Sequence, residues 1–300
     1  MTTHSLETLR DRLLASTGAM MAAPAGLEFD FSQPRGEAAL VPVNSVSWRI
    51  FKNPATLFIG GVAAVILELG EPSVRSGVWD HSSFQRDAVM RLRRTGAAAM
   101  MTVYGPRSAA EEMIARVVKM HGRVTGQTPD GTAYHANDQR LLDWVQATAS
   151  FGFIEAYSRF AHPLDRAEQS RAFAEGAQAA RLYGAVGAPS SVTEWEAMLA
   201  TLERTLERSD IVLEFLDIMR SAPALPLPLR PLQRLMVRAA VDIVPAAVRQ
   251  RLGLEKAGLN AFQRRLVMLM ARAADRLPLA SAPPAQASMR MGQRPDYLYR

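Results

Sequence analysis

The segment NPATLFIGGVAAVILEL, residues 53–69, decides the fold of this chain. Asn53 is a good helix cap and Pro54 suits the first helical position, so the segment predicts a helix that begins here and runs to about Leu69. Its apolar run stops at Glu68, well short of the roughly 20 residues that a membrane-spanning helix needs. We therefore expect a buried core helix.

The glycine pair inside this helix, Gly60-Gly61, needs an explanation. Each glycine costs about 1 kcal/mol relative to alanine in a helix interior. Either the close crossing of a second helix or the approach of a flat ligand to the backbone would offset that cost. We keep both interpretations open, and we take Gly60 and Gly61 as candidate cofactor-binding residues.

Helical signals continue along the rest of the chain. Further helices are expected from about Phe84 to Tyr104, from the capping box Ser108–Glu111 past His121, from Asn137-Asp138 to Pro163, from the capping box Ser191–Glu194 to about Arg208, and over 209–221, 228–243, 245–252 and 258–276. Only residues 126–136, with Asp130-Gly131 at the tip, predict a turn or short hairpin. No segment alternates with period two for long enough to build a sheet, so the sequence predicts an all-α fold.

The chain divides into three parts by composition. Residues 1–44 predict an N-terminal helix and lead-in, because Ser16-Thr17-Gly18 interrupts the mildly apolar stretch that a secretory signal would need. Residues 45–280 predict a single multi-helix domain. Residues 281–300, rich in Ala, Pro and Ser, predict an extended C-terminal tail. Pro223–Pro231 predicts a helix–helix connection within the domain.

Composition narrows the possible functions. The chain has 300 residues, of which 48% are hydrophobic, so it can bury a sizeable core, and its lack of cysteine excludes disulfides, iron–sulfur clusters and thiolate ligands. The net charge of +6 comes from 35 basic residues, nearly all of them arginine, spread among 29 acidic residues without a basic tract. We therefore expect no specific nucleic-acid partner and no transmembrane segment, and we expect a cytoplasmic protein.

The sequence RLRRT, residues 91–95, places Arg91, Arg94 and Thr95 on one helical face. These side chains could bind carboxylates, orient dioxygen or simply face water. The small apolar run that follows Thr95 indicates tight packing, and an arginine at such a boundary is costly without a partner.

The sequence MHGRV, residues 120–124, carries a histidine in line with apolar residues. His121 follows Ile114 and Val117 at helical spacing, which indicates an inward stripe. A buried imidazole needs partners for both ring nitrogens. It is either a core histidine bonded to a backbone carbonyl or an axial ligand to iron whose other nitrogen meets a polar acceptor.

Several catalytic signatures are missing from the sequence. It has no Gly-x-Ser-x-Gly elbow, no phosphate-binding Walker loop, no His-Glu-x-x-His and no Glu-x-x-His pair. These absences argue against an α/β-hydrolase, a P-loop enzyme, a zinc protease and a diiron bundle.

Four stretches together resemble a known family. The segments NPATLFIGGVAAVILELGEPSVRSGVWDHSSF (53–84), RLRRTG (91–96), MHGRVTG (120–126) and YHANDQRLLDWVQATASFGFIEAYSRF (134–160) are similar to the oxygenase family that contains latex clearing protein, the rubber oxygenase, and the MpaB-type oxygenases. The resemblance covers roughly residues 45–245.

This resemblance implies a globin-related helical core that holds haem b. His121 would be the proximal iron ligand, and Arg91, Arg94 and Thr95 would line the distal side as candidate catalytic residues. Better-known members use dioxygen to cleave a carbon–carbon double bond in isoprenoid substrates.

Two positions depart from the family pattern. The rubber-cleaving members carry lysine where this chain has Arg94, and an arginine effectively never loses its proton to bind iron. Many relatives also have histidine in a WVHAT element where this chain has Gln146, which leaves His121 as the better candidate ligand.

The leading hypothesis is a haem b-dependent oxygenase that acts with dioxygen on a small hydrophobic substrate of isoprenoid or other unsaturated type. One alternative is a sensor or carrier that binds haem or a lipophile without turnover. Another is a helical interaction protein in which His121 is structural. The sequence does not fix the oligomeric state.

Overall fold

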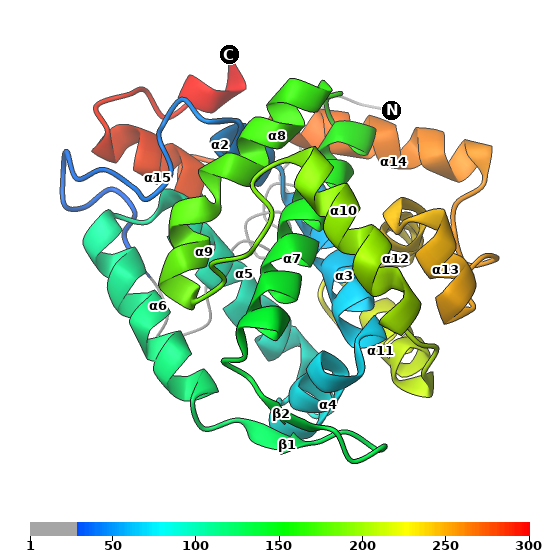
Figure 1. The fold of residues 1–300 in the computed structure, drawn as a ribbon. Coiled ribbons are helices and arrows are strands. Elements are labelled where there is room, and N and C mark those ends of the chain that lie inside the picture. The colour runs from blue at the N-terminus through cyan, green and yellow to red at the C-terminus, as the bar shows by residue number, and fades with distance from the viewer. Residues whose placement is uncertain (1–28) are drawn as a thin grey trace.

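The computed structural model describes residues 29–300 of the chain (Figure 1). The first part of the expected N-terminal helix and lead-in, residues 1–28, lies outside the described residues. Residues 29–44 form turns and bends and lead into the first described helix.

The described residues fold into helices with one small hairpin (Figure 1). The α-helices are α2 (Val46–Phe51), α3 (Pro54–Gly70), α4 (Pro72–His81), α5 (Ala88–Tyr104), α6 (Arg107–His121), α7 (Gln139–Phe160), α8 (Arg166–Glu175), α9 (Ala177–Tyr183), α10 (Val192–Leu202), α11 (Asp210–Ser221), α12 (Arg230–Ile243), α13 (Ala246–Leu252), α14 (Ala261–Ala274) and α15 (Pro283–Arg290). The 3-10 turns are η1 (Glu203–Thr205), η2 (Leu227–Leu229) and η3 (Tyr297–Tyr299). The all-α prediction is confirmed.

The hairpin interrupts the helical order between α6 and α7. Strands β1 (Thr125–Gln127) and β2 (Ala133–His135) pair antiparallel, with Gly126 opposite Tyr134. Gly131 at the tip has a φ of 87°, a left-handed conformation that glycine adopts without strain. The Asp130-Gly131 signal thus predicted this turn correctly.

Helix α3 is the central element of the fold. The Asn53 side chain accepts hydrogen bonds from the backbone N–H groups of Ala55 and Thr56, as the sequence predicted for its cap. Most of the helix is buried, because α7, α12, α11 and α14 all pack against it (Figure 1). A helix that is apolar on nearly every side is stable only when neighbours surround it in this way.

Helix α7 makes the closest contact with α3. A Cβ atom added at Gly60 would lie 2.6 Å from the backbone oxygen of Gly152 on α7, so the two backbones touch. Gly152 is equally close to the Gly60 carbonyl from the other side. Helix crossing therefore explains Gly60, and this glycine contacts protein backbone at the crossing.

The start of α6 differs from the predicted capping box. The helix begins at Arg107, and no side chain of its own caps it. Instead, the Ser108 backbone N–H donates to the Glu37 carboxylate at 2.7 Å. A residue 71 positions away thus supplies the acceptor that Ser108 and Glu111 were expected to provide.

The C-terminal segment 281–300 is not an extended tail, and that expectation was wrong. It contains helix α15, whose residues are mostly buried, and the turn η3. The buried Arg290 guanidinium donates to the backbone oxygens of Phe31, Glu37 and Tyr104 at 2.6–2.9 Å. These long-range hydrogen bonds fix the segment, and local composition gives no sign of them.

None of the helices in residues 29–300 is by itself long and apolar enough to cross a membrane. Helices α3 and α4 meet that test only as a pair, and they are bent by 112° relative to each other.

Candidate functional site

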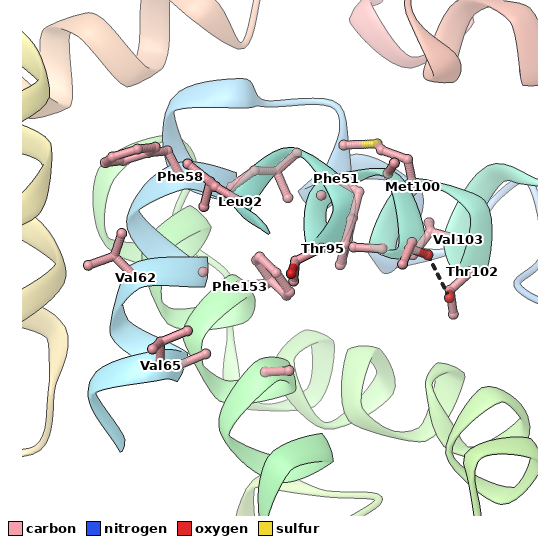
Figure 2. A pocket seen from close by; sticks show the side chains of 18 of the residues that line it. Phe51, Phe58, Val62, Val65, Leu92, Thr95, Met100, Thr102, Val103 and Phe153 are labelled. Carbon is pink, nitrogen blue, oxygen red and sulfur yellow. Dashed lines mark hydrogen bonds between the residues drawn. The ribbon is translucent and has the colours of Figure 1, made fainter. Parts of the chain in front are cut away.

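A cavity of about 430 Å³ lies between α3, α5 and α7 (Figure 2). Apolar side chains dominate its wall; those labelled in Figure 2 are Phe51, Phe58, Val62, Val65, Leu92, Met100, Val103 and Phe153. Helix α3 supplies lining residues from Pro54 to Glu68, so the cavity extends along most of that helix. Its volume and walls suit a hydrophobic ligand.

One acidic side chain lies in this apolar wall. Glu68 is half-buried near the end of α3, and burial raises the pKa of its carboxyl to about 7. The nearby Arg91 cation and the Thr148 hydroxyl, 3.5 Å from Glu68 Oε1, act in the opposite direction. Glu68 can therefore exchange a proton near neutral pH, which an ordinary surface glutamate does not do.

Of the three residues on the RLRRT face of α5, two line the cavity and one does not. Arg91 is half-buried and lines it, and burial lowers the pKa of the guanidinium while the Glu68 charge opposes that shift. Thr95 also lines the cavity (Figure 2). Its Oγ1 donates to the Arg91 backbone oxygen at 3.0 Å. Arg94 is exposed and is not among the lining residues.

The two glycines of α3 also have different surroundings. Gly61 lines the cavity, and a Cβ atom there would meet only the Phe153 ring at 3.9 Å, an ordinary contact. Gly60 contacts the α7 backbone and lies outside the lining. Of the two candidate cofactor-binding glycines, only Gly61 faces the cavity.

His121 is the last residue of α6 and is half-buried. Ile114 on the expected stripe is buried. Val124, which continues the same helical spacing in the sequence, lies beyond the end of the helix. Burial and then the Arg91 charge lower the pKa of His121, so its imidazole is neutral at pH 7. A neutral imidazole is the form that binds a metal.

His121 also has unused hydrogen-bonding capacity. Its Nδ1 is buried without a hydrogen-bond partner in the described part of the chain, and the same holds for Oδ1 of Asn137. Asn137 lies beside the end of α6, because its Nδ2 donates to the Val118 backbone oxygen at 3.1 Å. Buried polar atoms without partners are uncommon in folded proteins, and a catalytic role or a bound ion is one explanation for them.

The cavity walls and the His121 ring each have a property that a haem site needs. A haem needs apolar walls and one imidazole, since the porphyrin itself supplies the equatorial ligands. The cavity offers such walls, and His121 offers a neutral ring with a free nitrogen. His121 does not itself line the cavity. Arg91 does line it, and its charge lowers the pKa of both Glu68 and His121. Within residues 29–300, no group of three or more His, Asp or Glu side chains is placed to hold a bare metal ion.

Sequence reasoning missed the role of Glu68. The signal was present, because Glu68 is the only charged residue in a helix that is otherwise apolar on every side. Its approach to Arg91 and Thr148, however, depends on how α3, α5 and α7 pack.

The fold and the site define a helical protein with an apolar cavity that carries a titratable acidic group beside an arginine. The family model described as "ER-bound oxygenase mpaB/B'/Rubber oxygenase, catalytic domain" matches residues 48–276. The match covers most of the chain, which therefore belongs to this oxygenase family, as the sequence resemblance predicted. No curated protein and no solved structure matches the chain. The globin-related core stays a prediction.

Proposed function

We propose that this protein is a haem b-dependent oxygenase that acts with dioxygen on a hydrophobic, unsaturated substrate. Membership of the oxygenase family supports the reaction class. The observation that carries the proposal is the apolar cavity with Glu68, Arg91 and Thr95 in its wall. A hydrocarbon gains free energy by leaving water for such a cavity, at about 25 cal/mol per Å² of apolar surface buried.

The side chains of the cavity have distinct roles in this proposal. Arg91 stabilises negative charge that develops on oxygen, because a fixed cation in a poorly hydrated site acts far more strongly than in water. Thr95 adds a hydroxyl at the same wall. Glu68 holds or accepts a proton near neutral pH, so proton transfer needs no water from outside the cavity.

His121 would bind the haem iron, and Gly61 would allow the porphyrin or the substrate to approach α3. Asn137 would accept a hydrogen bond from the other ring nitrogen of His121 and so fix the orientation of the imidazole. When bound, haem supplies the redox chemistry that activates dioxygen, which no side chain of this cavity supplies. Arg94 would act from the exposed rim of the site.

A product assay tests the proposal. The purified protein, supplemented with haemin, is incubated with prenyl or other alkene substrates under ¹⁸O-labelled dioxygen, and the products are analysed by mass spectrometry. We expect labelled oxygen at a former double bond, together with loss of product under nitrogen. Haem binding without any oxygenated product would instead support the sensor or carrier hypothesis, which uses the same cavity without turnover.

A further inference from the structure

Helix α7 contributes a further polar pair to the cavity wall, on a different side of the helix from Thr148, which contacts Glu68. Gln146 and Ser150 both line the cavity, and Gln146 Nε2 donates to Ser150 Oγ at 3.4 Å. The two residues are four positions apart and share one helical face. Thr148, which approaches Glu68, is two positions from each and therefore about 200° away around the helix.

Gln146 and Ser150 have hydrogen-bonding capacity that the protein does not use. A hydroxyl in a helix often donates to the backbone oxygen four residues earlier, as Thr102 does to Ala98 at 2.8 Å in the same cavity. Ser150 donates no hydrogen bond within residues 29–300, and Gln146 Oε1 accepts none there. The pair thus offers the Ser150 O–H and the second Gln146 Nε2–H as free donors, and Gln146 Oε1 as a free acceptor, in a mainly apolar wall.

From this arrangement we propose that Gln146 and Ser150 bind a hydroxyl group on a substrate that is otherwise hydrocarbon. A hydroxyl can donate to Gln146 Oε1 and accept from Ser150 Oγ, so it satisfies the one free acceptor and the Ser150 donor together. A carboxylate can accept from the free donors of the pair, but it has no proton to donate and so leaves Gln146 Oε1 unpaired. A pure hydrocarbon leaves both groups unpaired at a cost of about 1 kcal/mol or more each.

The substrate class is therefore an alcohol or phenol with a long apolar body. The apolar part occupies the cavity along α3, and the hydroxyl end lies at Gln146 and Ser150. As a statement about substrate, this inference rests on the proposed oxygenase function. The binding step itself does not.

Equilibrium dialysis tests the inference on the full chain loaded with haemin. The probes are a long-chain prenyl alcohol, the matching hydrocarbon without the hydroxyl, and the matching carboxylic acid. We expect the alcohol to bind at least roughly tenfold more tightly than the hydrocarbon, and more tightly than the acid. Gln146→Leu and Ser150→Ala should each remove most of the preference over the hydrocarbon. Thr102→Val should keep that preference, because the Thr102 hydroxyl is already engaged with Ala98.

Two results would overturn the inference: equal binding of alcohol and hydrocarbon by the unchanged protein, or an unchanged preference in both variants. Ser150→Ala is the milder change and keeps the test decisive if Gln146→Leu does not fold. Loss of alcohol binding on loading with haemin would also overturn it, because the cofactor would then occupy this position.

The same assay without haemin separates this inference from the proposed function. If the protein takes up no haem and forms no product, but still prefers the alcohol, the oxygenase proposal fails and the Gln146–Ser150 site stands. If labelled products form from a hydrocarbon as readily as from its alcohol, and the two bind equally, the oxygenase proposal stands and the hydroxyl site fails.

Discussion

Gly60 and Gly61 are neighbours in sequence but lie on two sides of α3 with different surroundings. At Gly60 its backbone touches the α7 backbone, and no side chain could fit between them. At Gly61, about 100° further around the helix, it borders the cavity and has room to spare. The first glycine is needed for the close packing of two helices, and the second leaves space for a ligand. The Gly-Gly pair in the sequence does not show which glycine serves which need.

The largest expected effect comes from adding a methyl group at the helix crossing. Gly60→Ala should lower the free energy of unfolding by roughly 3 kcal/mol or more, because the new Cβ would lie 2.6 Å from the Gly152 oxygen and neither backbone can yield cheaply. Chemical denaturation monitored by circular dichroism measures this. Full stability of the variant would contradict the close approach of α3 and α7.

The second prediction concerns stability against pH and comes from the cavity side of α3. The unfolded Glu68 carboxyl titrates near 4.5 and the folded one near 7, so the native state holds the proton more tightly. The raised pKa of Glu68 therefore makes the free energy of unfolding depend on pH. Its stabilising contribution is fully present below about pH 4.5 and is lost as pH rises through 7, and the total loss is about 3 kcal/mol at most.

A glutamine side chain cannot ionise, so the Glu68→Gln variant should not lose this stability as pH rises. It should therefore be more stable than the unchanged protein at pH 8. If Glu68 transfers protons, the variant should also be inactive. Denaturation curves at pH 5 and pH 8, recorded for both proteins, provide the measurement, and the difference between the two proteins removes the contributions of other groups. Parallel pH profiles would show that Glu68 titrates like an exposed carboxyl.

The sequence predicted the elements that are fixed by interactions between neighbouring residues. The Asn53 cap, the apolar run of α3 and the Asp130-Gly131 turn are all readable from neighbouring residues, and the structure contains each of them. The start of α6 and helix α15 were not predictable in this way. Glu37 caps the former, and the carbonyls that hold Arg290 lie on distant segments.

The candidate site shows the same division. The sequence singled out Arg91 and Thr95 through their helical spacing, and both line the cavity. It gave Arg94 equal weight, because spacing alone cannot tell which edge of a helical face becomes exposed. The role of Glu68 required the packing of three helices, which no local pattern encodes.

A smaller effect of opposite sign is expected at Gly61. Gly61→Ala should raise the free energy of unfolding by up to about 1 kcal/mol, since alanine favours the helix and its methyl group meets only Phe153 at 3.9 Å. It is the matched control for Gly60→Ala, with the same change at the next residue. Equal destabilisation by both substitutions would remove the distinction between the two sides of α3.

The smallest expected effect is a pair of pKa shifts that follow from the position of Arg91. Its charge lowers the pKa of both Glu68 and His121, so Arg91→Gln should raise both values. NMR titration of the His121 ring protons and of the Glu68 carboxyl would detect the shifts. Arg93→Gln, on the same helix, is the control. If the two pKa values did not change, the charge of Arg91 would not act on Glu68 and His121.

The most direct measurement is an optical titration of the protein with haemin, carried out in parallel on His121→Ala and on the exposed-histidine control His162→Ala. If His121 holds haem beside this cavity, the unchanged protein and His162→Ala should both develop a Soret band at one equivalent of haemin, whereas His121→Ala should bind far more weakly or show an altered spectrum. An absent Soret band in all three proteins, or the same band and affinity in all three, would contradict the assignment of His121 as the haem ligand.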